Sequence, residues 1–167
     1  MAAIELNDYE KAEKELSYAA DMLDGSQHYM YMINLGLLKI RQDELNKAIS
    51  ILKSVIADLR KESDSPPFAD EMRRAHLNLS LALLRSEDYD AAQNAASESL
   101  ELALRLRHRE GEINARNNLG IALYLCGDEE EGRDSLRAAL EMAESYYGIS
   151  HAKTTGIRET LKRSNKH

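Results

Sequence analysis

The chain of 167 residues has only two prolines, Pro66 and Pro67, one cysteine and no tryptophan. With only eight glycines as well, long stretches contain no residue that stops a helix. The single cysteine, Cys126, excludes an internal disulfide framework and fits a reducing compartment. Runs of β-branched residues are also absent, which disfavours strands. These absences predict an all-α protein.

No stretch of the sequence approaches the roughly 20 apolar residues of a membrane-spanning helix. The first residues, 1–8, lack the basic and apolar segments of a signal peptide. The formal net charge is −7, so non-specific binding to nucleic acid or to an anionic membrane is not expected. We therefore expect a cytoplasmic protein whose partners are neither nucleic acid nor membrane.

Motifs of catalysis and metal binding are missing too. The sequence has no glycine-rich phosphate loop, no His-Glu-x-x-His and no Gly-x-Ser-x-Gly. One cysteine cannot form a zinc cluster, and the histidines share no helical-turn spacing. His76, in a helical apolar pattern, is expected to be a buried structural residue. We predict that the protein is not an enzyme and has no catalytic residue, cofactor or metal.

A short motif is present in three copies. Its third residue is small, and another small residue always follows 12 positions later. The copies themselves lie 44 and then 40 residues apart. A constant internal spacing with a variable outer period indicates one structural unit copied in tandem, with looser joints between copies. The motifs with their following small residues are Asn34-Leu35-Gly36 with Ala48, Asn78-Leu79-Ser80 with Ala92, and Asn118-Leu119-Gly120 with Gly132.

Each copy indicates two helices joined by a short turn. In the first copy, small and apolar residues recur at helical spacing on both sides of a turn at 43–44, and the other copies repeat this. The small third residue of each motif lets the neighbouring helix approach closely. The inward stripes of the first copy are Met32, Leu35, Gly36 and Ile40, then Ala48, Leu52 and Val55.

These patterns predict a single domain of about eight helices in antiparallel pairs. The expected full repeats are 29–65, 68–109 and 112–147. A half repeat, 7–27, has only the second helix, and 2–6 is expected to be the last turn of a first helix that the chain lacks. Residues 150–164 are expected to form a C-terminal helix, which either caps the array or begins a further repeat.

The three copies and the half copy resemble the tetratricopeptide repeat, over residues 7 to 147. That repeat carries a large residue, then Leu-Gly, then an aromatic residue, and later Ala and Pro. The sequence departs from it in lacking the closing Pro and in having Met32, His76 and Arg116 where Trp is usual. Its periods also exceed the usual value of about 34. Long repeats of this kind are similar to those of kinesin light chains, Pins-type adaptors and bacterial peptide-sensing regulators.

The resemblance implies a right-handed superhelix whose first helices line a concave groove that binds a protein or peptide. Asparagines at one repeat position would hydrogen-bond the backbone of an extended peptide. Alternatively, Asn is merely the common residue there. The column is Asn34, Asn78 and Asn118, with Asn114 and Asn117 beside it.

The same register places apolar residues in the groove, which suits an amphipathic helix or a hydrophobic peptide. The alternatives are that these residues pack between repeats or that the C-terminal helix fills the groove. The apolar set comprises Ile33, Leu37, Leu77, Leu81, Leu84, Ile121 and Tyr124.

Three arginines, Arg41, Arg74 and Arg85, also fall on this face, where no carboxylate is expected. They would favour an acidic peptide or a C-terminal carboxylate. The alternative is that they are solvated or form ion pairs with Glu71 and Glu87.

We therefore expect an adaptor or scaffold module that binds a partner segment in its groove. Two other functions fit the same sequence. One is an oligomerisation or assembly domain that associates through exposed ends of the array. The other is the peptide-sensing regulatory domain of a larger protein.

Overall fold

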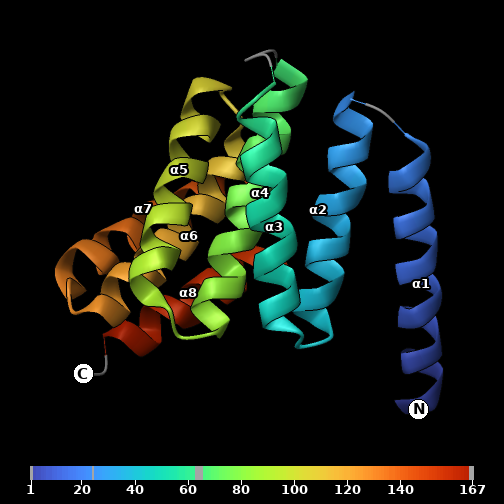
Figure 1. Cartoon of the computed structure of the whole chain (residues 1–167). Helices are drawn as coiled ribbons and strands as arrows, with labels where there is room; N and C mark the ends of the chain where they lie inside the picture. Colours follow the sequence, from blue (N-terminus) through green and yellow to red (C-terminus); the bar gives the residue numbers. More distant parts are fainter. Residues whose placement is uncertain (1, 24, 63–65, 166–167) are drawn as a thin grey trace.

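The computed structural model describes residues 2–23, 25–62 and 66–165. These residues contain eight helices and no strand, which confirms the all-α prediction (Figure 1). The helices are α1 (Ala2–Met22), α2 (Gly25–Arg41), α3 (Leu45–Leu59), α4 (Pro66–Arg85), α5 (Tyr89–Arg105), α6 (Arg109–Cys126), α7 (Glu129–Tyr147) and α8 (Ala152–Ser164).

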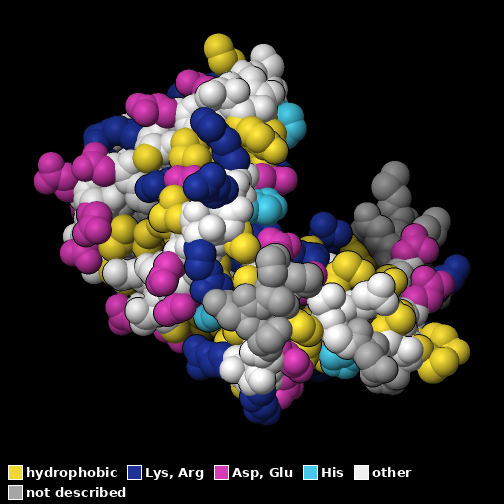
Figure 2. Space-filling view, turned by 90° about the horizontal axis from the view of Figure 1, so that it is seen from above, with side chains coloured by type: hydrophobic (Ala, Val, Ile, Leu, Met, Phe, Trp, Pro, Cys, Tyr) yellow, Lys and Arg dark blue, Asp and Glu magenta, His cyan; other side chains and the backbone are white. Residues whose placement is uncertain are grey.

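The helices form two rows. Each helix packs against the next one along the chain, and the even-numbered helices also contact one another in order, α2 with α4, α4 with α6 and α6 with α8. The first helices of the repeats therefore make one face of the array, and the second helices make the other. Viewed from above, the molecule curves around a hollow (Figure 2).

Small residues let the two helices of each pair approach closely. A Cβ atom on Gly36 would lie 2.8 Å from Cγ of Leu52, and one on Gly120 would lie 2.8 Å from the carbonyl oxygen of Gly132. The predicted role of these small residues is confirmed. At Gly132 the contact is with backbone, because a Cβ there would lie 2.7 Å from the amide nitrogen of Tyr124.

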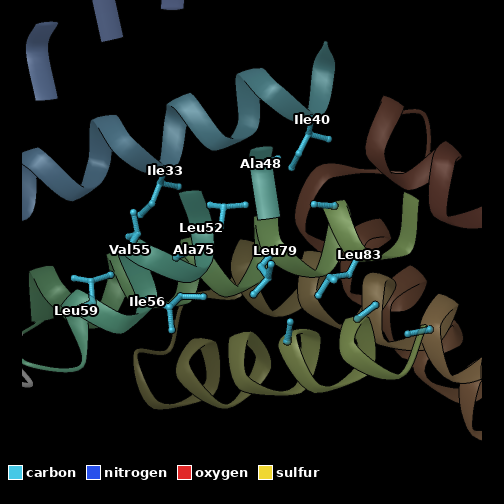
Figure 3. Close-up of a cluster of buried hydrophobic side chains, with 14 residues drawn as sticks. Ile33, Ile40, Ala48, Leu52, Val55, Ile56, Leu59, Ala75, Leu79 and Leu83 are labelled. Atoms are coloured by element: carbon cyan, nitrogen blue, oxygen red, sulfur yellow. The ribbon is translucent and has the colours of Figure 1, made fainter. Parts of the chain in front are cut away.

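The main buried apolar cluster runs from α2 to α6 (Figure 3). Ala48 and Leu52 are fully buried, as the predicted stripe of α3 requires, and so is Ile33 of α2. Ile33 corrects one expectation, since it belongs to this core and does not line the groove. A second cluster joins α6, α7 and α8 around Ile113 and Ile157. Burial of side chains of this size contributes about 1.5–3 kcal/mol each, so the array is held together by contacts between neighbouring helices.

The same backbone turn joins the helices of all three full pairs. The residue before each N-cap has a positive φ, 63° at Asp43, 63° at Glu87 and 103° at Gly127. The amide that follows then donates to a carbonyl five residues earlier, as from Glu44 to Lys39 at 2.9 Å. This repeated turn fixes the constant spacing of 12 residues within each copy.

The first helix corrects the expected register. Ala2–Met22 is one continuous helix, so residues 2–6 are not the end of a separate helix. No residue of this stretch is glycine or proline, and none has the positive φ that ends a first helix elsewhere. Without such a residue the helix continues.

The last helix stands where the first helix of a further repeat would stand, against α7 and α6. It forms a wall of the groove and does not fill it. Aligning Ile157 of α8 with Asn118 of α6 places Glu159 where α6 has Gly120. Glu159 is exposed, so the face of α8 at this position is polar.

Candidate functional site

Two adjoining clefts lie along the face made by the first helices. The first, which we call the α4–α6–α8 cleft, has a volume of about 420 Å³. Its walls come from three successive first helices and combine carboxamide, apolar and charged groups. The lining residues are Leu77, Asn78 and Leu81 of α4, Asn114, Asn117 and Asn118 of α6, and Lys153, Gly156, Ile157 and Thr160 of α8.

The second, the α2–α4–α6 cleft, has a volume of about 460 Å³. It shares Leu77, Asn78 and Asn114 with the first, so the two form one continuous surface, which we call the concave groove. Its remaining lining residues are Leu37, Asp70, Arg73, Arg74, His108 and Glu110.

The predicted asparagine column is divided between structural and free side chains. Asn34 Oδ1 accepts a hydrogen bond from Arg74 Nη2 at 3.1 Å. Asn118 is 9% exposed, and its Nδ2 donates to Ser80 Oγ at 2.9 Å. Although Asn118 borders the cleft, its amide joins α6 to α4. Of the column, only Asn78 presents an uncommitted carboxamide. Ser80 is the residue in the sequence that indicates the structural role of Asn118. It replaces the glycine of the other two copies, and its hydroxyl oxygen accepts the hydrogen bond from Asn118.

The free carboxamides of the groove come from Asn78 of α4 and from two further asparagines of α6, Asn114 and Asn117. Neither Asn78 nor Asn114 makes a side-chain hydrogen bond within the described part of the chain. Asn117 Nδ2 donates to Asn118 Oδ1 at the long distance of 3.4 Å. Its own Oδ1 is buried and has no partner among the described residues. The groove therefore displays Asn78, Asn114 and Asn117.

The predicted arginines do not form a positive patch in the groove. Arg74 Nη1 donates to both carboxylate oxygens of Glu71, at 3.0 and 3.1 Å, which confirms the ion-pair alternative for this residue. Burial raises the pKa of Glu71 and outweighs the opposing effect of Arg74. Arg85 pairs with Asp43 at 2.9 Å, not with Glu87. Arg41 is exposed and lines neither cleft.

Carboxylates that the sequence reasoning did not expect stand in the groove beside its cations. Arg73 pairs with Asp70 at 2.8 Å, and Lys153 pairs with Glu110 across α8 and α6. The hydrogen bond from Lys153 lowers the pKa of Glu110. Burial disfavours the charged Lys153, but the hydrogen bond to Glu110 prevails and raises the pKa of Lys153. Positive and negative groups in the groove are therefore balanced.

The apolar lining is narrower than predicted. Leu37, Leu77 and Leu81 border the clefts. Ile121 and Tyr124 lie outside both of them, and the guanidinium carbon of Arg133 lies 5.8 Å from the centre of the Tyr124 ring. The apolar lining that remains is shared with the carboxamides of the same clefts.

Sequence reasoning missed the contribution of α8. Lys153, Gly156 and Thr160 line the groove together with Ile157. Gly156 and Ile157 follow Lys153 by three and four residues, just as Asn117 and Asn118 follow Asn114 in α6. Alignment of 152–164 with the repeats would have found them.

His76 is buried at 6% exposure, as predicted. Burial, with a smaller contribution from the positive charge of Arg60, lowers its pKa to about 4. The side chain is therefore neutral at physiological pH. It lines neither cleft of the concave groove.

Two further properties of the described residues bear on other kinds of site. None of the described helices is long and apolar enough to cross a membrane. Within the same residues, no group of three or more His, Cys, Asp and Glu side chains is placed to hold a metal ion.

Solved structures with this architecture exist, although no family model and no curated protein matches the sequence. The chain superposes on BtubC (BKLC) from P. vanneervenii with a TM-score of 0.72 at 14% identity, covering 95% of this chain and 67% of that one. The apo form of RapI gives 0.76 at 18% identity, covering 96% and 55%.

A kinesin light chain from P. anserina with nearly identical TPR-like repeats gives a TM-score of 0.72 at 14% identity, covering 96% of this chain and 77% of that one. The chain thus spans between about half and three quarters of the length of these proteins. Together with the repeated helix pairs and their common turn, these superpositions confirm the resemblance that the sequence motifs indicated: the chain has the fold of a tetratricopeptide-like repeat array.

Proposed function

We propose that the protein is a non-enzymatic adaptor or scaffold module that holds an extended segment of a partner protein in the concave groove. The observation that carries this proposal is the pair of uncommitted carboxamides, Asn78 and Asn114, on adjacent first helices where the two clefts meet. A carboxamide offers both a donor and an acceptor, which matches the N–H and C=O groups of an extended backbone.

The groove also favours a segment over a small charged ligand. Its cations are already paired with Asp70, Glu71 and Glu110, so a strongly acidic ligand finds no unpaired positive group there. Leucines beside the carboxamides offer an apolar strip for alternate side chains of the segment. The preference for acidic peptides expected from Arg41, Arg74 and Arg85 therefore loses its support.

The test compares Asn78→Ala/Asn114→Ala with the wild type. Partners are captured from lysate, and the shortest binding peptide of a captured protein is then titrated by fluorescence polarisation. Two lost hydrogen bonds, each contributing about 0.5–1.5 kcal/mol, should weaken binding by roughly tenfold or more. Asn118 is left intact, because it joins α4 and α6.

The matched control is Asn94→Ala, which removes an exposed carboxamide from α5, in the other row of helices. It should bind like the wild type. The proposal fails if the double variant keeps full affinity, or if the control loses as much affinity as the double variant does.

A second function is favoured by the exposed apolar residues at the N-terminal end of the array. Tyr18 and Met22 of α1 are 68% and 66% exposed. Exposed array ends can associate, which would make the chain an assembly domain. Light scattering over a range of concentrations tests this, since a monomer at all concentrations contradicts it.

A further inference from the structure

Gly156 has no packing reason to be glycine. It lies inside helix α8, where glycine is less favourable than alanine. A Cβ added there would meet no atom within 4 Å, whereas a Cβ on Gly36, Gly120 or Gly132 would clash. Gly156 lines the α4–α6–α8 cleft. Its physical effect is to leave open the space that a side chain would occupy.

A chain of hydrogen bonds fixes the orientation of the amide opposite. Ser80 Oγ donates to the carbonyl of Leu77 at 2.7 Å, so it accepts from Asn118 Nδ2 at 2.9 Å. Asn118 Oδ1 is then the acceptor for Asn117 Nδ2. This chain of hydrogen bonds leaves Asn117 Oδ1 as an acceptor with no donor among the described residues.

An unsatisfied buried acceptor is unfavourable unless a donor reaches it. The bond that holds the Asn117 amide is long, at 3.4 Å, so rotation of the amide about Cβ–Cγ sacrifices little. The group that satisfies it must be a hydrogen-bond donor, and the backbone N–H of an extended segment is one.

The charge in this cleft is already balanced. Its one cationic lining residue, Lys153, is paired with Glu110 and also contacts Tyr147. The rest of the lining consists of carboxamides, Thr160, Gly156 and three aliphatic side chains, those of Leu77, Leu81 and Ile157. An additional charge on an occupant would have no partner here and would lose hydration.

We propose that the α4–α6–α8 cleft is the specificity pocket of the groove, and that it takes an uncharged apolar side chain of the partner segment against Gly156. Asn117 Oδ1 accepts the N–H of the same segment. This inference rests on the proposed function and assigns to α8 the part of the groove that distinguishes one sequence from another.

The experiment selects binders from a random-peptide display library on the full chain. The selected peptides are titrated against wild type and Gly156→Leu by fluorescence polarisation. We expect an enriched apolar position, roughly tenfold or weaker binding to Gly156→Leu, and a similar loss when that apolar residue is changed to Glu or Lys. The melting temperature of Gly156→Leu should not fall, because leucine is a better helix former.

The control is Thr155→Leu, which adds a similar bulk to the neighbouring exposed position of α8, outside the cleft. It should bind the peptides like the wild type. Asn117→Ala should weaken binding without altering which apolar residue is selected.

The two proposals fail in different ways. If Asn78→Ala/Asn114→Ala abolishes peptide binding but Gly156→Leu leaves it unchanged, the groove binds and the specificity pocket is wrong. Selection of acidic or basic peptides also overturns the pocket. If no peptide is selected, or if binding ignores all of these variants, the proposed function fails together with the pocket.

Discussion

His76 makes the stability of the protein depend on pH. Its pKa is about 4 in the folded chain, against about 6.5 in an unfolded chain. Above pH 6.5 both states are neutral and the residue has no effect. As the pH falls from 6.5 to about 4, the unfolded state binds a proton first. The free energy of unfolding should therefore decrease by about 3 kcal/mol over this range.

Urea unfolding at several pH values across this range checks the prediction, with His76→Leu as the comparison. The variant lacks the imidazole. Its free energy of unfolding should therefore decrease over this pH range by about 3 kcal/mol less than that of the wild type. Identical slopes for the two proteins would show that His76 is not responsible.

Two glycines should respond to alanine in opposite ways. At Gly132 the new Cβ would meet the backbone of Tyr124 and Gly120 at 2.7 and 2.8 Å, so Gly132→Ala should destabilise by about 1–3 kcal/mol. At Gly156 the space is open, so Gly156→Ala should stabilise by about 0.5–1 kcal/mol. Thermal unfolding measures both. A stabilising Gly132→Ala would contradict the close helix contact described here.

At this scale, the sequence predicted which small residues pack, and its register agrees with the clefts at Asn78, Asn114 and Asn117 but not at Arg41 or Arg85. It could not predict which polar groups remain free. Asn118 is occupied because Ser80 stands opposite it, and Arg74 is occupied by Glu71 and Asn34. Such pairings depend on the distances between side chains of different helices. These distances cannot be predicted from the spacing of residues along the sequence.

Among the elements, α1 is the least supported. In the described structure it packs against α2 alone, whereas α4 contacts α2, α3, α5 and α6. In a repeat array each unit is stabilised by its neighbours, so a helix with one neighbour opens without disrupting the rest.

Hydrogen exchange followed by mass spectrometry should therefore find fast exchange in α1 and the slowest exchange in α4 and α6, each of which has four neighbouring helices. Addition of a groove-binding peptide should protect α4, α6 and α8 further, and should leave α1 unchanged. Protection of α1 equal to that of α4 would contradict this order.

The helices could be predicted because their apolar stripes have helical spacing and their ends carry turn residues. The start of α1 could not, since Asn7 and Asp8 resemble a turn but continue the helix. The role of α8 was left open between a cap and a further repeat. It stays open, because the spacing of apolar residues in 152–164 fits either one, and Glu159, at the place of Gly120 in α6, is exposed.

At the scale of the molecule, curvature and groove follow from one repeated contact. Each first helix packs on the next, and the groove crosses these contacts from α2 to α8. Exposed apolar residues lie at both ends of the array, Tyr18 and Met22 in α1 and Tyr146 and Ile149 just before α8. The surface therefore allows association through either end.

The turn shared by Asp43, Glu87 and Gly127 gives the three helix pairs the same backbone geometry at the point where the chain reverses. The turn sets the direction in which the second helix leaves the first, whatever side chains the helices carry. The same turn recurs at Arg107, between α5 and α6, where φ is 53°. One local backbone geometry therefore reverses the chain both within pairs and between two of them.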